Sequence, residues 1–507
     1  MLAYLKSLLN NWCLLTEKCG DCMRDFHKLD VVLEELGAAV RNKDKIALYG
    51  DYDVDGLMSL MICEKTLSLM EHKEFFLYPY YSRTHEIDFN LLNFCLSRKI
   101  NIVVICDTGS NNMDLLNKFC AYGIRCIVLD HHVTPYAYDD FPKECSVINT
   151  FVDEHYFGIN NTMCGASVVF CVCTALLDRY DISYDIGYLA IYALLAQYAD
   201  AVPMDTDFGK ELYSLAINRK SVPRCVDYFM ESYSEITRRF AEYTFAPKIN
   251  AIFRREQFSL INKLFLEPAP DAFLLVNQIK ELHVSTLELV DVMLERLAET
   301  WEDVNGIVVV SLTPLLNLDI SNNFILNHKG RIANKIANIE GKPCICVCDS
   351  GKEIEGSFRD LEGRDFLKYF SPLYKAGGHP PAFGFSIPYV EWSDFFGTVK
   401  TVGKVAAFEG LSKVSNPIYD MTRWFDLDML KHIAFKNEFA TPGKPATYVK
   451  ITLNRIVEST KYGLSYLLYS DGIDKVWFSS DKKIQYPQTI LLYPYLQKNL
   501  KLQAMWR

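Results

Sequence analysis

The chain has 507 residues, and this length predicts about two to four domains rather than one. Half of the residues are hydrophobic and 23% are charged, a globular balance that allows large buried cores. No uncharged apolar run reaches about 18 residues, so the sequence predicts no membrane-spanning segment and no membrane partner. The net charge of −10 argues against a protein that coats nucleic acid through charge alone. It does not exclude an enzyme acting on nucleic acid, because metal ions offset catalytic carboxylates locally.

The cysteines and the N-terminal residues both indicate the cellular compartment in which the protein works. The chain contains 16 cysteines, many of them inside apolar runs such as VVIC (103–106) and CICVC (344–348). Free cysteine packs there as a small hydrophobe, which is typical of a reducing compartment. The first residues lack the basic start and small-residue cleavage site of a signal peptide. We therefore predict a cytoplasmic protein.

Residues 1–204 alternate short β-branched runs with amphipathic stretches, the pattern of a mostly parallel α/β domain. The predicted strands are 45–50, 74–81, 100–107, 126–132 and 146–150. Helical patterns lie between them near 57–71, 87–98 and 111–122, and two more helices are predicted within 163–200.

Three further units are predicted downstream. Residues 205–303 read as a helical connector that ends in a long periodic helix. Residues 304–390 read as a smaller second α/β domain with strands at 306–312, 343–349 and 354–360, a helix near 328–340 and a loop at 376–387. Residues 391–507 end in aromatic and β-branched runs, which predict a small all-β module.

Aspartate and histidine gather where three predicted parallel strands end. The set comprises Asp51, Asp53 and Asp55 after the first strand, Asp107 after the third, and Asp130, His131 and His132 after the fourth. A single aspartate after a strand is most often a helix cap. The DxDxDG run lacks the closing glutamate of an EF-hand and follows a strand, so it is not a calcium loop of that kind. Because these strand ends meet in one crevice, the carboxylates would repel one another unless divalent cations neutralised them. Carboxylates with one or two imidazoles suit Mn²⁺ or Mg²⁺.

These motifs carry a family resemblance. DYDVDG (51–56), CDTG (106–109), LDHH (129–132) and QYADAVP (197–203) resemble the four motifs of the DHH phosphoesterase superfamily, in a form and spacing similar to its RecJ branch. PYYSR (79–83), PKINAIFRR (247–255), GSFRD (356–360) and AGGHPPAFGF (376–385) are similar to segments further along that branch. The likeness covers roughly residues 45–390. The C-terminal module, 391–507, stands where RecJ relatives carry an oligonucleotide-binding barrel, so the resemblance implies an OB-like module that binds nucleic acid.

The resemblance implies a site with two ions, Mn²⁺ or Mg²⁺. It implies that Asp107 bridges both ions, that Asp55, His131 and Asp200 hold one ion, and that Asp53 helps to hold the other. It further implies that His132 contacts the scissile phosphate or transfers a proton, while Asp51 and Asp130 orient the ligands. Tyr49 stands where small-substrate members of the superfamily have a histidine, so the resemblance implies that the first metal is held more loosely, as in the exonuclease branch.

The resemblance also implies a substrate-binding second domain. Ser357 and Arg359 offer a hydroxyl and a forked cation to a terminal phosphate, and Gly377, Gly378 and His379 form a segment whose backbone can approach it. Arg83 and Arg254 would extend the phosphate track. Lys248 and Phe253 depart from the family pattern around Arg254, which puts affinity for the 5′ end in question.

The function that the resemblance implies is a metal-dependent 5′→3′ exonuclease that degrades single-stranded DNA to 5′-mononucleotides. Its implied partners are single-stranded DNA with a 5′-phosphate and a single-strand-binding protein or helicase, acting with a monomeric cytoplasmic enzyme of a bacterium or phage. Two alternatives stay open. One is a DHH phosphodiesterase for short oligonucleotides or cyclic dinucleotides. The other is a catalytically weak replication or repair accessory that binds nucleic acid.

Overall fold

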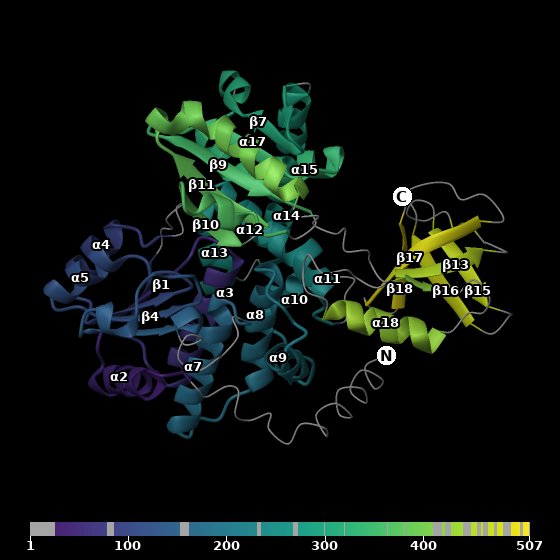
Figure 1. The fold of residues 1–507 in the computed structure, drawn as a ribbon. Helices are drawn as coiled ribbons and strands as arrows, with labels where there is room; N and C mark the ends of the chain where they lie inside the picture. Colours follow the sequence, from purple (N-terminus) through teal and green to yellow (C-terminus); the bar gives the residue numbers. More distant parts are fainter. Residues whose placement is uncertain are drawn as a thin grey trace.

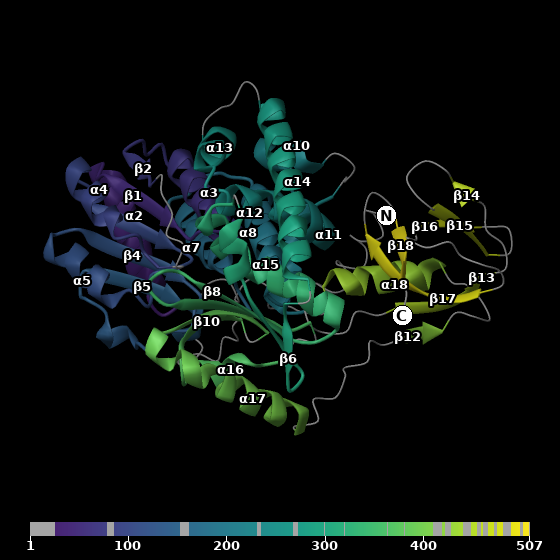
Figure 2. The ribbon, with the colours of Figure 1, turned by 90° about the horizontal axis from the view of Figure 1, so that it is seen from above.

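The computed structural model describes residues 26–78, 86–152, 162–230, 235–266, 272–298, 300–318, 320–361, 364–379 and 381–408, and between 418 and 505 the helix and strands named below. Figure 1 shows a first α/β domain, a second α/β lobe packed above it with a helical region alongside, and a C-terminal sheet to one side. The turned view in Figure 2 also shows the C-terminal sheet apart from the two lobes.

The first domain is built on a parallel five-stranded sheet of order β2-β1-β3-β4-β5. Its strands are β1 (Ile46–Gly50), β2 (Phe75–Leu77), β3 (Ile102–Cys106), β4 (Arg125–Asp130) and β5 (Cys145–Asn149). The predicted parallel α/β domain is confirmed.

Both faces of this sheet are covered, which explains why its strands are continuous apolar runs. Ile46 and Leu48 of β1 belong to one core, whereas Ala47 and Tyr49 point into the other. The first core is covered by α2 (Leu29–Asn42), α3 (Val54–Leu69), α7 (Gly165–Arg179) and α8 (Ile186–Ala199), and the second by α4 (Asn90–Arg98) and α5 (Met113–Ala121). A short 3₁₀-helix, η1 (Tyr138–Asp140), precedes β5.

A helical region follows, as predicted. It contains α9 (Asp207–Ile217), α10 (Arg224–Met230), α11 (Arg238–Phe240), η2 (Ala241–Phe245), α12 (Ala246–Arg254), α13 (Phe258–Ile261), η3 (Asn262–Leu266) and α14 (Ala272–Leu297), with η2 and η3 being π-helical. Val276 and Ile279 of α14 pack in the core of the first domain, whereas Val290 and Met293 pack in the second lobe. The long helix therefore connects the two lobes by contributing to the core of each.

The second lobe contains a mixed sheet of order β10-β11-β9-β8-β7-β6. Its elements are β6 (Glu302–Val304), β7 (Ile307–Ser311), η4 (Thr313–Asn317), α15 (Asn322–Glu340), β8 (Cys344–Asp349), β9 (Ile354–Arg359), α16 (Leu367–Phe370), β10 (Lys375–His379), β11 (Ala382–Ile387), η5 (Tyr389–Glu391) and α17 (Trp392–Phe408).

Two predictions about this lobe are wrong. Residues 376–387, expected as a loop, form the antiparallel pair β10–β11 instead. The lobe also continues past the expected end at 390, because Phe395, Val399 and Val402 of α17 pack into its core.

The C-terminal region combines one helix with a seven-stranded sheet of order β12-β13-β17-β18-β16-β15-β14. Its elements are β12 (Ile418–Asp420), α18 (Leu427–Glu438), β13 (Tyr448–Leu453), β14 (Glu458–Ser459), β15 (Ser465–Ser470), β16 (Asp474–Ser479), β17 (Gln488–Leu496) and β18 (Leu500–Met505). A β-rich C-terminal region is as predicted, while its OB-like character stays a prediction.

The start of this region is not separate from the first domain. Ala434 and Phe439, at the end of α18 and just beyond it, pack in the first domain's core, and the Tyr198 hydroxyl donates a 3.0 Å hydrogen bond to Glu438. The expected boundary at 391 therefore does not delimit one independent module. Among the helices that the structure describes, none combines the length and apolar content needed to cross a membrane.

Candidate metal centre

The DYDVDG motif forms a tight loop between β1 and α3. A Cβ at Gly56 would lie 2.3 Å from the Asp51 nitrogen and 2.4 Å from its carbonyl oxygen, so the loop closes only over glycine. Asp53 caps α3 by accepting a 3.1 Å hydrogen bond from the Gly56 amide, and Asp55 lies in the first turn of that helix. The loop thus brings three carboxylates to one end of the sheet.

Asp107 directly follows β3 and has an unusual backbone conformation. Its φ of 60° lies in the left-handed region, which aspartate tolerates better than most residues and which is often found at functional sites. The Asp107 amide donates a 2.8 Å hydrogen bond to the Leu129 carbonyl, which ties the turn to β4, and the residue is buried. The side chain is therefore held in one position beside the histidines of the next strand.

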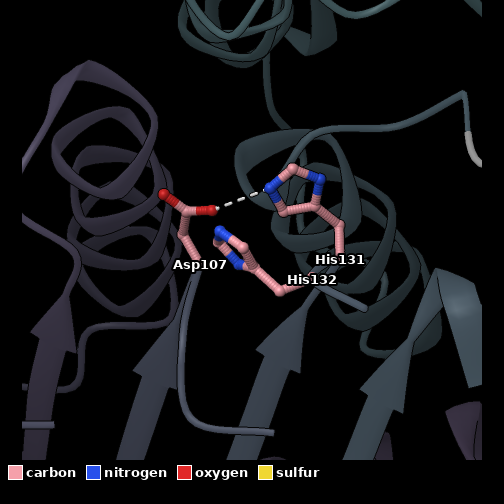
Figure 3. Close-up of side chains that lie close together, drawn as sticks. All are labelled: Asp107, His131 and His132. Atoms are coloured by element: carbon pink, nitrogen blue, oxygen red, sulfur yellow. Dashed lines mark ion pairs between the residues drawn. The ribbon is translucent and has the colours of Figure 1, made fainter. Parts of the chain in front are cut away.

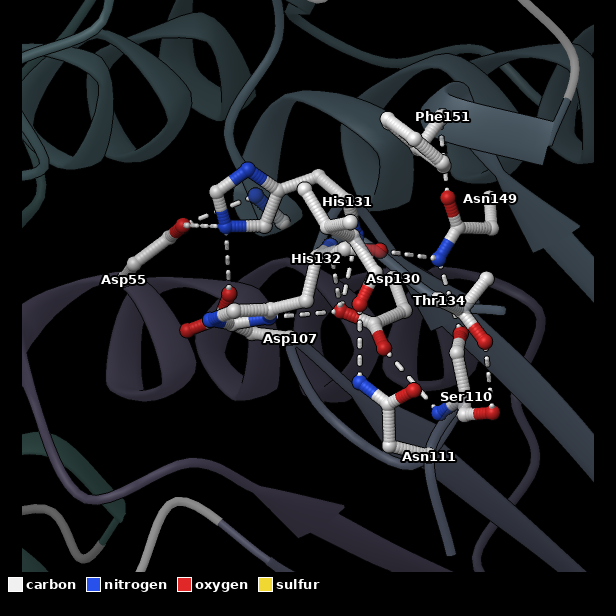
Figure 4. A network of polar contacts seen from close by, with 12 residues as sticks. Asp55, Asp107, Ser110, Asn111, Asp130, His131, His132, Thr134, Asn149 and Phe151 are labelled. Carbon is white, nitrogen blue, oxygen red and sulfur yellow. Dashed lines mark hydrogen bonds and ion pairs between the residues drawn. The ribbon is translucent and has the colours of Figure 1, made fainter. Parts of the chain in front are cut away.

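His131 is the focus of the cluster. Its Nε2 lies 3.2 Å from Asp107 Oδ1, 3.7 Å from Asp200 Oδ2 and 3.8 Å from Asp55 Oδ2. Figure 3 shows Asp107 and the two histidines converging above the strand ends, and Figure 4 adds Asp55 on the same side. Asp200 reaches the cluster from the C-terminal end of α8.

The structure brings all eight predicted catalytic and metal-binding side chains into one region. Three groups have potential ligand atoms within 4.8 Å of one another: Asp107, His131 and His132; Asp55, His131 and Asp200; and Asp51, Asp53 and Asp107. Asp107 and His131 each belong to two groups. That arrangement suits the predicted bridging role of Asp107. Asp51 was predicted only to orient the ligands, but its carboxylate lies close enough to Asp53 and Asp107 to be a ligand itself.

Asp130 organises the backbone of the DHH turn. Its Oδ1 accepts hydrogen bonds from the amides of His131 (2.7 Å) and His132 (3.2 Å) and lies 2.8 Å from His132 Nδ1. Asn149, at the end of β5, donates to the His132 carbonyl (3.0 Å) and to the Ser110 hydroxyl (2.8 Å), as Figure 4 shows. The contact with Asp130 orients the His132 imidazole, and the bond from Asn149 holds its backbone, which leaves Nε2 as the ring nitrogen not bonded to Asp130.

The charges of the cluster fit a divalent cation. Burial, reinforced by Asp200, raises the pKa of Asp55 to about 7, and burial with the charges of Asp55 and Asp53 raises the pKa of Asp107. Burial of the His132 ring opposes protonation, but the charge of Asp130 outweighs it and raises the pKa of His132. Asp107 Oδ1 is buried and accepts no hydrogen bond from the described residues. Carboxylates this close remain ionised together only when positive charge is added, and their oxygens are the donors that Mn²⁺ and Mg²⁺ prefer.

The second lobe supplies cations beside this centre. On β9, Arg359 Nη1 donates a 2.9 Å hydrogen bond to the buried Ser357 hydroxyl. Arg254, at the end of α12, is close enough to Arg359 and to Asp53 for both charges to act on its guanidinium. The predicted phosphate-binding residues Ser357 and Arg359 therefore lie together, and Arg254 interacts with Arg359 and with one of the carboxylates.

Within the described part of the chain, the other predicted substrate-binding residues do not lie beside Ser357 and Arg359. Gly377, Gly378 and His379 lie on β10, which pairs with β11, and β11 pairs with β9, so this segment is two strands from Ser357 and Arg359, roughly 10 Å. Gly378 has a φ of 129°, and a Cβ there would lie 2.9 Å from the Ala382 carbonyl oxygen of β11, so the hairpin itself requires a glycine at this position. Arg83 lies outside the described residues.

Comparison with known proteins identifies the group to which this site belongs. Residues 45–202 match the DHH family, N-terminal domain. The single-stranded-DNA-specific exonuclease RecJ of Bacillus subtilis is 23% identical over 383 residues, covering 70% of this chain and 45% of that protein. The chain is a RecJ-like protein of the DHH superfamily.

Solved RecJ structures share its fold. RecJ from Thermus thermophilus in complex with Mn²⁺ has a TM-score of 0.71 at 18% identity, covering 96% of this chain and 72% of the other. The same protein in complex with Mg²⁺ has a TM-score of 0.65 at 17% identity, covering 96% and 70%. The RecJ-like chain spans less than half of the length of its B. subtilis relative.

Several residues that position the site of this RecJ-like chain were not singled out from the sequence. The amides of Gly165 and Ala166, at the start of α7, each donate a 2.7 Å hydrogen bond to the Asp55 carboxylate. Gln197 is buried and accepts from the Cys164 amide (3.1 Å) and the Ser167 hydroxyl (2.7 Å), which holds that helix start in place. Tyr52 donates its hydroxyl to the Phe253 carbonyl, next to Arg254. Gln197 lies within the QYADAVP motif that carried the resemblance, but only the contacts reveal what these residues do.

Two carboxylates of the DYDVDG loop are expected to respond differently to neutralisation. Asp51→Asn should cost about 10- to 100-fold in metal affinity, as removal of an orienting charge does, and Asp55→Asn should cost more, because Asp55 faces His131 and Asp200 directly. Calorimetric titration of both variants with Mn²⁺ checks this. Equal losses would mean that Asp51 is itself a ligand, as its group with Asp53 and Asp107 allows.

Proposed function

We propose that this chain is a metal-dependent exonuclease that removes 5′-mononucleotides from single-stranded DNA in the 5′→3′ direction, using two Mn²⁺ or Mg²⁺ ions. The similarity to RecJ exonucleases supports the reaction class, and the Asp and His cluster supports the metals. The observation that carries the proposal is the convergence of the Asp and His side chains into groups that could hold two cations, with Arg254 close enough to Asp53 and Arg359 to interact with both charges. A terminal phosphate bound by these arginines would be one nucleotide away from the phosphodiester bond that is hydrolysed.

The residues of the chain divide the work as follows. Asp55, His131 and Asp200 would hold one cation, Asp53 would help to hold the other, and Asp107 would contact both. When bound, such cations supply Lewis-acid stabilisation of charge on the phosphate and lower the pKa of a water molecule. His132 is oriented through Nδ1 by Asp130, so its Nε2 is the atom that would donate to a phosphate oxygen or to the leaving 3′-oxygen.

The second lobe would determine the 5′→3′ direction of degradation. Ser357 and Arg359 offer a hydroxyl and a guanidinium to a terminal phosphate, and Arg359 needs no carboxylate to hold it, because it bonds to Ser357 and to the carbonyls of Phe358 and Phe383. Among the residues of the lobe that the structure describes, no carboxylate forms an ion pair with the Arg359 guanidinium. Fixing the 5′-phosphate at a set distance from the metals would release one nucleotide at a time.

Arg359→Ala is expected to weaken binding of 5′-phosphorylated strands by roughly 2–3 kcal/mol, or about 30- to 150-fold, the loss of one charge-assisted phosphate contact. Strands with a 5′-hydroxyl should be affected much less, because they lack the group that is bound. The measurement is the dissociation constant and the single-turnover rate for both strands, with wild type and variant.

Lys342→Ala is the matched control, since it removes one cation of the same lobe that is paired with Asp303 at the surface. Equal loss on both strands would make Arg359 a general or structural contact. Release of nucleotides from 5′- and 3′-labelled DNA and RNA, with Mn²⁺ and with EDTA, tests the activity itself. If the chain hydrolyses only short oligonucleotides or cyclic dinucleotides, it is a phosphodiesterase of that kind and not an exonuclease. If it hydrolyses nothing in the presence of metal, it is an accessory protein that binds nucleic acid.

A further inference from the structure

An ion pair joins the first domain to the second lobe. Lys375 Nζ, on β10 of the second lobe, lies 2.9 Å from Glu86 Oε1 of the first domain. Figure 1 shows β10 on the side of the second lobe that faces the first domain. The side chain of Lys375 is 78% exposed and that of Glu86 is 42% exposed. An ion pair that water reaches so easily contributes little to stability, so another anion can take the place of Glu86 at small cost.

The backbone around Glu86 is held beside the ends of the strands that carry the carboxylates. The Tyr49 hydroxyl, at the end of β1, donates a 3.1 Å hydrogen bond to the Glu86 carbonyl. The Ile87 amide donates a 3.1 Å hydrogen bond to Asn112 Oδ1. A Cβ at Gly109, in the CDTG motif, would lie 3.6 Å from Ile87 Cδ1. These contacts fix the backbone from which the Glu86 carboxylate projects, next to the candidate metal centre.

Lys375 projects from the same face of the second-lobe sheet as Ser357 and Arg359. In the antiparallel pairing, Lys375 lies opposite Ser386, and Ser386 lies opposite Glu355. Residues directly opposite one another share a face, and alternate residues along a strand return to it. Glu355, Ser357 and Arg359 of β9 therefore share the face of Lys375. Because Lys375 contacts Glu86, this face is turned toward the first domain.

The same face is bare between β10 and Ser357. Gly377 pairs with Gly384, and Gly384 pairs with Ser357, so two glycines complete this row of the sheet. Among the described atoms, a Cβ at Gly377 would meet nothing within 4 Å, and a Cβ at Gly384 would meet only a backbone oxygen at 3.8 Å. Lys375 lies two residues before Gly377 on β10. The described residues thus leave space over the glycines, with Ser357 at one end of the row and Lys375 beside the other.

The spacing separates Lys375 from the predicted site of the terminal phosphate. Two strand spacings and two residues along the strand place its backbone roughly 12 Å from that of Ser357. One phosphate therefore does not contact both residues through short side chains. A DNA strand whose terminal phosphate lies at Ser357 and Arg359 carries further phosphates at regular intervals, and an exposed ammonium group on the same face is suited to bind one of them.

We propose that Lys375 binds a backbone phosphate of the DNA strand, and that Glu86 occupies this position until the DNA displaces it. This inference rests on the proposed function. Carboxylate and phosphate oxygens are both anionic acceptors for an ammonium group, so the lysine exchanges one for the other. The displaced Glu86 carboxylate is already partly hydrated, so its release is not costly. Glu86 thus acts as a competitor that weakens DNA binding and holds the lysine ready for the phosphate.

The first test measures binding of a 5′-phosphorylated single strand with a 3′ fluorophore to the full chain, by fluorescence anisotropy in EDTA. Lys375→Ala should weaken binding about tenfold, the scale of one charged contact. It should also reduce the slope of log affinity against log salt concentration by about 0.7, the value for one phosphate of a single strand. Lys375→Arg should keep most of the affinity. Glu86→Gln should tighten binding about threefold, because the DNA no longer displaces a carboxylate.

Exchange at one position also predicts that the two effects depend on each other. In the Lys375→Ala background, Glu86→Gln should have no further effect, because no ammonium group is left to compete for. If Glu86→Gln tightens binding equally in both backgrounds, Glu86 acts only through general charge and the proposal is overturned. Glu302→Gln is the matched control, since Glu302 is an exposed carboxylate on β6, at the opposite edge of the same sheet. It should leave the affinity unchanged.

The wild-type chain offers a test that depends on no variant. A carbodiimide joins a carboxylate to an amine in contact with it, so it should link Glu86 to Lys375, as detected by mass spectrometry of the digested protein. Saturating single-stranded DNA should suppress this cross-link, and an equal yield with and without DNA would overturn the exchange. If the exchange is found but Mn²⁺ gives no nucleotide release, the chain binds single strands and the proposed exonuclease activity fails. If release is found while the two substitutions act additively, only the exchange fails.

Discussion

Asp107→Ala is expected to lower phosphodiester hydrolysis by several orders of magnitude, the largest effect of any single change in this chain. Asp107 belongs to two of the three potential ligand groups and lies 3.2 Å from His131. Removing it takes away the oxygen common to both predicted ions, so at least one ion should be lost. Single-turnover rates and Mn²⁺ stoichiometry measure this. Retention of more than about a tenth of wild-type activity at saturating Mn²⁺ would contradict the bridging role.

A stability measurement separates loss of a ligand from loss of the fold. The pKa of Asp107 is raised in the folded protein, so its ionised form costs stability at pH values above the folded pKa, and this cost disappears as the pH falls below the unfolded value. Asp107→Asn should therefore raise the melting temperature of the metal-free protein at neutral pH and change it little near pH 4. Added Mn²⁺ should stabilise wild type much more than the variant. A lower melting temperature in EDTA at neutral pH would mean that Asp107 supports the fold rather than a metal.

The sheet of the first domain could be predicted from the sequence because of how its strands are buried. Runs such as IALYG and IVVIC are apolar throughout because both faces are covered, and each ends in charged residues that no core would accept. Parallel strands leave those ends at one edge, so the convergence of Asp51, Asp107 and His131 follows from strand order alone.

The second lobe and the C-terminal region were less predictable. Residues 376–387 contain three glycines and two prolines, which favour a loop, yet the pairing with β9 makes them strands. Helices α17 and α18 carry no local signal of the domain on which they pack. Their assignment depends on tertiary contacts, such as those of Phe395 with the second lobe and Phe439 with the first domain.

The same limit applies to the residues that support the site. The sequence predicts ligands because carboxylates and imidazoles have few other reasons to cluster. It cannot predict that Gly165 lies against Asp107, because the two are 58 positions apart and glycine carries no chemistry of its own. A Cβ at Gly165 would lie 2.5 Å from both Cβ and Oδ1 of Asp107. No side chain fits there without displacing the carboxylate.

Gly165→Ala is therefore expected to reduce turnover by at least about a hundredfold without unfolding the protein. Alanine is the better helix former, so at the start of α7 it should favour the helix by roughly 0.5–1 kcal/mol if space allowed. The added methyl instead pushes Asp107 Oδ1, which lies 3.2 Å from His131, and disturbs the amide that donates to Asp55. Because the left-handed turn at Asp107 is tied to Leu129, the backbone cannot easily move away.

Gly397→Ala provides the matched control for this prediction, since Gly397 lies in α17 with nothing near its missing Cβ. It should keep both turnover and metal binding and melt at the same or a higher temperature. For Gly165→Ala, titration with Mn²⁺ should show weaker binding, and excess Mn²⁺ should recover only part of the rate, because occupancy can be restored by mass action but ligand geometry cannot. Full recovery would mean that the methyl affects affinity alone. An unchanged rate and affinity would show that Asp107 can adjust to the methyl, and that its fixed position is not what the chemistry requires.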